Sequence, residues 1–265
     1  MDLFDRSHLF LVSKIKMDHL TTDQITYFIG TSGWTYDHWK GRFYPQDLPK
    51  KSWFDYYARQ FQAVEVNATF YRTFKDQTYQ TWKERAPQGF GYVLKTPQSI
   101  THRKYLQDVD ADIRTFFQSC SLLEDKFEMI LLQVAPNMPY DLGRLQAALS
   151  AFPDPSRVAV EFRRPEWLNP DTLNLLRAVG AAICDVDSPQ QKLTDSLTSS
   201  RAYLRLHGRN HWYAYNYSDD ELRGFADLAR NLAQKGASRV YIFFNNDYEA
   251  YAPANARALQ AMLEG

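Results

Sequence analysis

The sequence contains little cysteine and little histidine. Two cysteines, Cys120 and Cys184, occur among 265 residues, and they lie far apart without metal-ligand spacing; there are six histidines. Cysteines of this kind are ordinarily small buried thiols in a reducing compartment. The sequence therefore predicts neither a disulfide framework nor a cysteine-based metal site.

The chain also lacks an excess of charge of either sign. Lysine and arginine together number 31, and aspartate and glutamate together number 31. Domains that wrap nucleic acid usually carry a basic excess. The balance disfavours a nucleic-acid-binding protein, although a local basic patch would remain compatible with one.

Long apolar runs are absent as well. No segment approaches the roughly 20 apolar residues of a transmembrane helix, and the apolar patch at residues 9–12 is too short for a secretory signal. We interpret residues 1–24 as an N-terminal extension, in which Met17 offers an alternative start, and residues 25–265 as the folded domain. A cytoplasmic location without a membrane partner is the expectation.

Segments typical of strands and helices alternate from Tyr27 onward. The segments with strand-like patterns are residues 27–32, 63–68, 91–96, 128–134, 157–162, 181–186, 202–207 and 239–244. Eight strands alternating with helices over about 240 residues fit a (β/α)8 barrel, which typically needs about 250. The predicted fold class is α/β, a single-domain TIM-type barrel. A doubly wound open sheet is the alternative, disfavoured because no glycine-rich phosphate loop follows the first strand.

The segments between the strands carry helix signals of unequal strength. The clearest helix covers residues 218–236, where Ser218 and Glu221 predict a capping box. Two segments fit a barrel less well. Residues 33–52 form a long aromatic loop where the first helix should begin, and residues 187–200 offer only a weak sixth helix.

The strand at residues 157–162 indicates where a site would lie. Ala159, Glu161 and Arg163 share one face, so that face changes from apolar to ionic toward the C-terminal end. Isolated buried charges are costly unless they are paired or functional. A barrel with a site at its C-terminal mouth requires this change.

The same change recurs at the ends of six further strands. The polar residues expected to point inward there are Glu65, Asn67, Lys95, Gln133, Asp185, Asp187, Arg205, His207, Asn245 and Asp247. Because the C-terminal ends of barrel strands meet at one rim, we expect one polar cavity. Each of these residues also has a structural interpretation, as a satisfied ion pair inside the barrel or as a turn residue.

The residue types in this cavity suit acid–base chemistry. Glu161 or Glu65 would act as base or nucleophile, and His207 would donate the proton. Asp185 is a fourth candidate catalytic residue. Hydrolysis of a phosphoester and hydrolysis of a glycosidic bond are both open, because two carboxylates on nonadjacent strands also fit a glycosidase.

The cations of the cavity predict a small anionic substrate. Arg163, Arg205 and Lys95 suit a phosphate or carboxylate, which they would bind by charge-assisted hydrogen bonds. The remaining candidate substrate-binding residues are Asn67, Tyr71, Trp34 and Asn245.

Two aromatic loops are expected to lie over the mouth. They cover residues 34–44, after the first strand, and residues 211–217, after the seventh. Exposed tryptophan and tyrosine can stack on a sugar or a base, or fold down as a hydrophobic lid. Both interpretations stay open.

A catalytic metal is not expected, because the three cations would repel it and only His207 lies at a strand end. No cofactor is expected either. One alternative is nonetheless a metal-dependent nuclease with Glu65, Glu161, Asp185 and His207 as ligands. Another is a non-catalytic barrel that binds a ligand or a partner.

Six motifs, in order, resemble the YecE-like family, also called domain of unknown function 72. They are GTSGWTYDHWKGRFYP (30–45), EVNATFYR (65–72), LKTPQSITH (94–102), EFRRPEW (161–167), YLRLHG (203–208) and YIFFNND (241–247). The resemblance spans residues 27–263 and implies a TIM-type barrel, but it implies no established reaction. Its motif residues match at Gly30, Ser32, Gly33, Trp34, Glu65, Asn67, Tyr71, Lys95, Glu161, Arg163, Arg205, His207, Gly208, Asn245 and Asn246.

The chain departs from the family pattern at two places. Arg164 stands where the family usually has histidine, which removes a proton carrier and adds charge. Residues 133–136 read Gln-Val-Ala-Pro where a double proline commonly follows the glutamine, and this reshapes one wall of the mouth. Family members look broadly similar to barrel nucleases of the endonuclease IV type, which is an analogy of fold alone.

Overall fold

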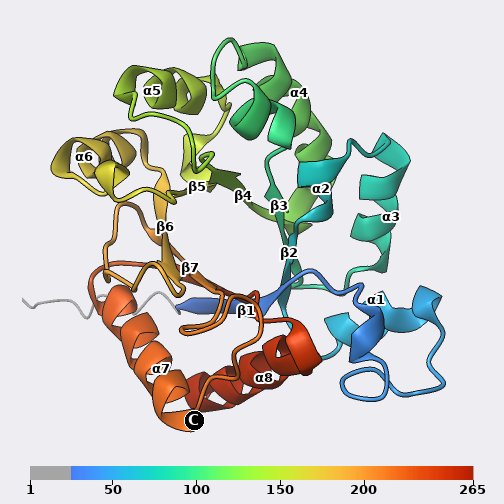
Figure 1. Cartoon of the computed structure of the whole chain (residues 1–265). Coiled ribbons are helices and arrows are strands. Elements are labelled where there is room, and N and C mark those ends of the chain that lie inside the picture. The colour runs from blue at the N-terminus through green and yellow to red at the C-terminus, as the bar shows by residue number, and fades with distance from the viewer. Residues whose placement is uncertain (1–24, 265) are drawn as a thin grey trace, which may run out of the picture.

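The computed structural model describes residues 25–264, and its strands form a closed barrel in sequential order (Figure 1). All neighbouring strands are parallel, including the pair β1 and β8 that closes the ring. The strands are β1 Thr26–Ser32, β2 Ala63–Val66, β3 Gly91–Lys95, β4 Phe127–Gln133, β5 Val158–Glu161, β6 Ala182–Asp187, β7 Arg201–Leu206 and β8 Arg239–Phe244. The predicted TIM-type barrel is therefore confirmed, and the open sheet is not formed.

Helices form an outer ring around the strands (Figure 1). The α-helices are α1 Trp53–Ala58, α2 Ala68–Tyr71, α3 Asp76–Arg85, α4 Asp110–Ser121, α5 Leu142–Ala151, α6 Pro170–Val179, α7 Asp219–Gln234 and α8 Tyr251–Glu264. The ring is interrupted between α6 and α7, because the described connection from β6 to β7 contains no helix. The weak helix signal at residues 187–200 thus corresponds to a coil.

Local sequence signals explain where the strongest helices begin. Ser218 and Glu221 form the predicted capping box at α7, in which the Ser218 side chain accepts from the Glu221 amide. The Asn169 side chain accepts from the Thr172 amide at 3.0 Å and caps α6. The left-handed Gly180 (φ 75°) ends α6.

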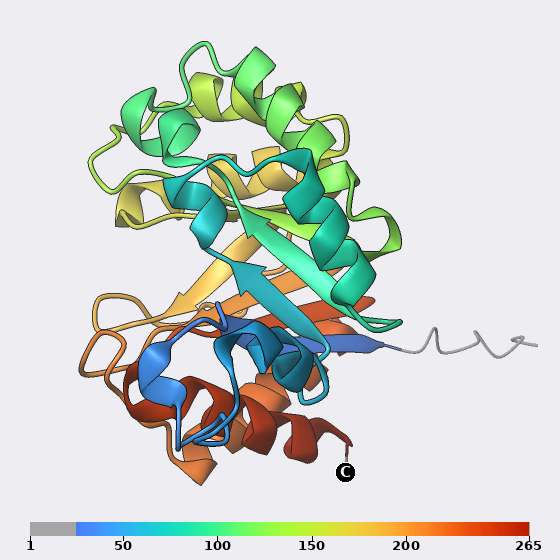
Figure 2. The same ribbon diagram turned by 90° about the vertical axis from the view of Figure 1, so that its right-hand side faces the viewer.

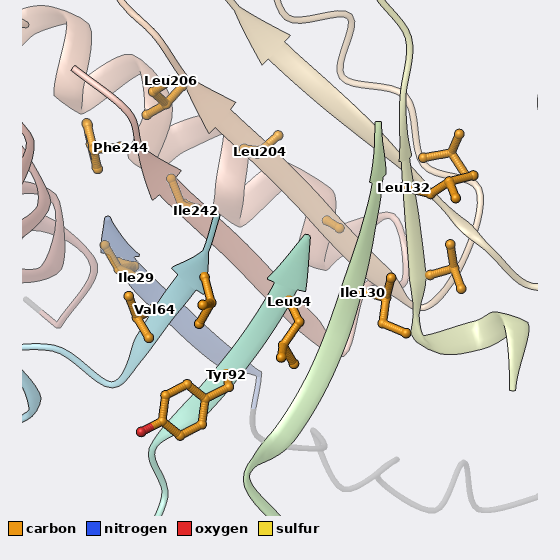
Figure 3. Close-up of a cluster of buried hydrophobic side chains, with 14 of the residues drawn as sticks. Ile29, Val64, Tyr92, Leu94, Ile130, Leu132, Leu204, Leu206, Ile242 and Phe244 are labelled. Atoms are coloured by element: carbon orange, nitrogen blue, oxygen red, sulfur yellow. The ribbon is translucent and has the colours of Figure 1, made fainter. Parts of the chain in front are cut away.

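The two faces of the strands bury different residues. The outward face packs apolar side chains such as Ile29, Leu94 and Ile130 against the helices (Figure 3). The inward face fills the barrel with a separate cluster of small and aromatic residues: Phe28, Ala63, Val93, Met129, Leu131, Ala159, Ala182, Cys184, Val186, Tyr203, Tyr241 and Phe243. Below this plug, Glu128 pairs with Arg239 and accepts a hydrogen bond from Tyr241. Above it, toward the C-terminal ends of the strands, lies a larger group of polar residues.

The N-terminal extension proposed for residues 1–24 lies outside the described residues. Within residues 25–264, none of the helices has the length and apolar character that a membrane crossing requires.

Candidate functional site

Seven strands deliver polar side chains to the C-terminal rim of the barrel, the side toward which the arrowheads point in Figure 2. These residues are Ser32, Glu65, Lys95, Gln133, Glu161, Arg163, Arg205, His207 and Asn245. The seven strands are not the seven expected from the sequence. Strand β1 contributes Ser32, which the sequence argument did not select, whereas β6 contributes the apolar pair Cys184 and Val186.

Asp185 is not brought to this cluster, because it lies on the opposite face of β6. Its carboxylate accepts hydrogen bonds from the backbone amides of Thr194 (2.7 Å) and Asp195 (2.9 Å). It therefore anchors the β6–β7 connection. Burial raises the pKa of Asp185 to about 6, against the opposing effect of these hydrogen bonds.

Arg205 lies at the centre of the rim, fully buried, and bridges two buried carboxylates. Its Nε and Nη2 donate to the two oxygens of Glu65 at 3.0 and 2.7 Å, and its Nη1 donates to Glu161 at 2.5 Å. Ser32 and Tyr203 each donate a further hydrogen bond to Glu65 at 2.7 Å. Both oxygens of Glu65 are thus fully occupied.

Glu161 is occupied in the same way. Besides Arg205, it accepts a hydrogen bond from Gln133 Nε2 at 2.7 Å and pairs with Arg163. Burial alone would raise the pKa of Glu161, but the charges of Arg205 and Arg163 outweigh it and hold the pKa well below its usual value. We call Glu65, Glu161 and Arg205 the buried ionic layer.

Two further cations face outward from this layer, and we call Lys95 and Arg163 the mouth cations. Lys95 retains 9% of its surface and lies 4.3 Å from the ring centroid of Phe70. Arg163 is 19% exposed at its side chain and lies 5.1 Å from the ring of Trp212. Burial and the charge of Arg205 lower the pKa of Lys95 to about 8.

His207 lies beside the mouth cations and is fully buried. Asn245 Nδ2 is 2.9 Å from its Nδ1, and Arg163 Nη2 is 3.5 Å from its Nε2. Burial and the charge of Arg205 lower the pKa of His207 well below its usual value. The imidazole is therefore neutral at pH 7, and a neutral imidazole has one donor and one acceptor nitrogen.

The two aromatic loops behave differently. In the first, Trp39 and Tyr44 are buried, and Tyr44 stacks on Trp53 of α1 at 4.6 Å. This loop is part of the hydrophobic core. In the second, the rings of Trp212 and Tyr213 lie 5.3 and 5.8 Å from the ring of His207, so that this loop covers the mouth.

Within residues 25–264, no hydrogen bond joins three of the predicted substrate-binding residues, Trp34, Tyr71 and Asn67, to the mouth cations. Trp34 packs edge-on against Phe54 and Trp82 at the helical layer. Tyr71, on α2, keeps 72% of its surface exposed. Asn67 follows β2, and its Oδ1 is buried without a hydrogen-bond partner.

The sequence argument missed two contributors besides Ser32. Tyr203 was counted as an apolar inward position, yet its hydroxyl binds Glu65. His102 was noted only as a loop histidine, but its ring lies 4.8 Å from that of Phe70. Burial and the charge of Lys95 lower the pKa of His102. The period of two along β1 and β7 carried the signal for Ser32 and Tyr203.

The metal ligands of the nuclease alternative are not gathered. Glu65 and Glu161 share Arg205, and Asp185 faces away from both. Within residues 25–264, no three side chains of His, Cys, Asp or Glu are grouped to hold a metal ion.

Comparisons with known proteins bear on the family and the fold of this chain. The family model "Protein of unknown function DUF72" matches residues 28–265. The UPF0759 protein YunF of Bacillus subtilis is 25% identical, covering 89% of this chain and 94% of YunF. The UPF0759 protein YecE of Escherichia coli is 30% identical over 112 residues, which are 42% of this chain and 41% of YecE.

Solved structures share the fold. A DUF72 family protein from Thermotoga maritima superposes with a TM-score of 0.82 at 29% identity, covering 91% of this chain and all of the other. A second, from Enterococcus faecalis, has a TM-score of 0.75 at 20% identity, covering 91% of this chain and 96% of the other, and speaks to the fold alone.

Proposed function

Because the chain belongs to the DUF72 family of proteins of unknown function, we propose a function from the barrel mouth itself. The mouth binds a small anionic substrate, a phosphomonoester or a carboxylate, through Lys95 and Arg163. Lys95 and His207 then carry out acid–base chemistry on it.

The observation that carries this proposal is the excess of positive charge at the mouth. Three cations (Lys95, Arg163 and Arg205) lie with two carboxylates (Glu65 and Glu161), which leaves one net positive charge. Glu65 pairs with Arg205, and Glu161 pairs with Arg205 and Arg163. Within residues 25–264 no carboxylate forms an ion pair with Lys95, so a ligand anion is the partner that Lys95 lacks.

The proton chemistry is assigned to Lys95 and His207 by their ionisation. A general acid or base works best when its pKa is near the operating pH, and the pKa of Lys95 is about 8. His207 Nε2 is only loosely engaged, at 3.5 Å from Arg163 Nη2, so the neutral imidazole can exchange a proton at that atom.

Glu65 and Glu161 receive a different role in this proposal from the one expected. Their oxygens are occupied by Arg205 and its neighbours, and both residues are fully buried. A nucleophile or base needs a free lone pair directed at substrate. We therefore assign them to holding Arg205 in position, which weakens the glycosidase alternative.

Calorimetric titration with inorganic phosphate tests the binding step. Lys95→Met and Arg163→Met should each weaken phosphate binding by about 10- to 100-fold, because each removes a charge-assisted hydrogen bond. Arg223→Met, which removes an exposed arginine on α7, is the matched control and should bind like the parent.

Turnover separates an enzyme from a binding protein. Phosphorylated and carboxylated metabolites would be incubated with the parent and with Lys95→Met, and products followed by NMR. Loss of turnover in Lys95→Met supports the proposal, whereas binding without turnover by the parent supports the non-catalytic barrel. Unchanged phosphate affinity in both mouth variants would refute the anion site.

A further inference from the structure

The missing helix between α6 and α7 leaves a groove beside the mouth. A cavity of about 630 Å³ lies between the β6–β7 connection and the segment after β7. Its lining includes Asp187, Gln190, Gln191, Lys192, Arg209 and Asn210. In a complete barrel a helix would cover β6 at this position.

A smaller cavity of about 170 Å³, which we call the connecting cavity, lies between this groove and Arg163 of the mouth and is lined by residues of both. It shares Ser188, Gln190 and Gln191 with the larger one, and its other walls include Arg163 and Trp212. One mouth cation is therefore also a wall of the connecting cavity. A ligand anion on Arg163 would direct the rest of the ligand along this path.

The wall that carries the two glutamines is held by backbone hydrogen bonds. Ser188 and Gln191 form an antiparallel bridge, with the Ser188 amide donating to the Gln191 carbonyl at 2.8 Å. The Ser188 hydroxyl accepts from the amides of Gln190 (3.3 Å) and Gln191 (3.1 Å). This turn thus fixes the backbone of Gln190 and Gln191, which line both cavities.

Of the two cations that line the groove, Lys192 and Arg209, the second is neutralised. Arg209 pairs with Asp187 at 3.4 Å and with Glu221 at 3.0 Å, and its guanidinium lies 5.4 Å from the ring of Phe225. The groove therefore offers amide groups beside Lys192, and the connecting cavity adds the aromatic face of Trp212. Such a lining suits a neutral polar ring, which can stack on tryptophan and hydrogen-bond to amides.

We propose that the connecting cavity and groove hold the ring of the substrate while its anionic group binds at Lys95 and Arg163. The ligand class is a phosphomonoester that carries a polar ring, as sugar phosphates and nucleotides do. This inference rests on the proposed anion site and extends it by naming the second half of the ligand.

The test compares a bare anion with anions that carry a ring. Inorganic phosphate, glucose 6-phosphate and AMP would be titrated calorimetrically into the parent and into the double variant Gln190→Ala/Gln191→Ala. In the parent, one ring-bearing probe should bind more tightly than inorganic phosphate. The double variant should lose about tenfold in affinity for that probe and none for inorganic phosphate.

Gln234→Ala is the matched control, because Gln234 is exposed at the C-terminal end of α7, near the start of β8. It should bind all three probes like the parent.

If the parent binds inorganic phosphate with the same affinity as both ring-bearing probes, this inference is overturned while the proposed anion site stands. A double variant that keeps its affinity for the ring-bearing probes would do the same. A parent that binds none of the probes would overturn both proposals. The tighter of glucose 6-phosphate and AMP identifies the kind of ring.

Discussion

The buried ionic layer and the mouth cations lie next to one another, yet they differ in how their charges are satisfied. In the buried layer, Arg205 is bonded to Glu65 and Glu161, and each carboxylate receives additional donors. Within residues 25–264, the Lys95 side chain forms no ion pair or hydrogen bond, and it lies near the charges of the layer and over the ring of Phe70. Charge alone therefore does not mark a functional residue; the state of its hydrogen bonds does.

This contrast indicates which charged residues stabilise the fold and which are available to bind a ligand. A buried ion pair contributes little net stability against a well-packed apolar replacement, but breaking one partner is costly. A partly exposed cation held near like charges costs stability and is available to a ligand. Arg205 and Lys95 should thus respond oppositely to substitution, whereas Arg163 shares features of both groups because it also pairs with Glu161.

The largest effect is expected from Arg205→Met. The variant leaves Glu65 and Glu161 buried without their shared cation, so the free energy of unfolding should fall by about 3–5 kcal/mol. Urea unfolding followed by circular dichroism measures it, with Arg223→Met as the control. A loss below about 1 kcal/mol would mean that the layer is not a stabilising unit, since surface arginines change stability this little.

Glu161→Gln should have the next largest effect. Its amide replaces a carboxylate that pairs with Arg205 and Arg163, so stability at pH 7 should fall by about 2–3 kcal/mol. The folded pKa of Glu161 lies below its ordinary value of 4.5, so this stabilisation is present above pH 4.5 and is lost as the pH falls below it.

Urea unfolding at a series of pH values checks this sign. The difference between the parent and Glu161→Gln should shrink progressively below pH 4.5. A difference that stays constant down to acid pH would contradict the assignment of a paired, ionised Glu161.

Lys95→Met should act in the opposite direction. The pKa of Lys95 falls from 10.5 to about 8 in the folded state, so the folded protein binds fewer protons between these values and its stability rises with pH across them. At pH 7 the variant should therefore be more stable than the parent by about 1–3 kcal/mol.

The gain in Lys95→Met should disappear as the pH approaches 10.5, and phosphate affinity of the parent should decline above pH 8. Unfolding and titration at matched pH measure the two effects. If Lys95→Met is instead less stable than the parent, Lys95 stabilises the fold as the buried ionic layer does, and the contrast between the two is wrong.

The smallest effect is expected from Tyr71→Phe. The side chain is 72% exposed, so stability should change by no more than about 0.5 kcal/mol. Phosphate affinity should equal that of the parent in calorimetric titration. A tenfold loss of affinity would extend the mouth to α2.

Strand order and strand ends were predictable because each depends on local pattern. The period of two in β5 placed Glu161 and Arg163 on the inward face, and the same rule placed Glu65, Lys95, Arg205 and His207. Capping residues such as Ser218 likewise predicted the start of the helix that follows. These features require no knowledge of distant neighbours.

Strand β6 shows where that reasoning fails. Its two faces, Ala182-Cys184-Val186 and Ile183-Asp185-Asp187, both begin apolar, so the pattern does not fix which one turns inward. The choice depends on the hydrogen bonds that Asp185 makes to residues of the following loop. Those bonds are tertiary contacts, which a pattern along one strand does not contain.

The prediction that both aromatic loops lie over the mouth failed for a related reason. Residues 34–44 and 211–217 have similar composition, but the first found a hydrophobic partner in α1 while the second remained beside His207. Aromatic side chains serve cores and binding sites equally well. The residues that pack against the loop decide whether it joins the core or the binding site.

The gap in the outer ring has a consequence for motion as well as for binding. Strand β6 is covered at that point by a coil that is held by the Asp185 carboxylate and the Thr198 hydroxyl, whereas other strands are braced by helices. Local opening is easiest where few apolar contacts must separate. The barrel should therefore open locally at β6 and the β6–β7 connection. The amide protons of β6 should exchange with deuterium sooner than those of the other seven strands.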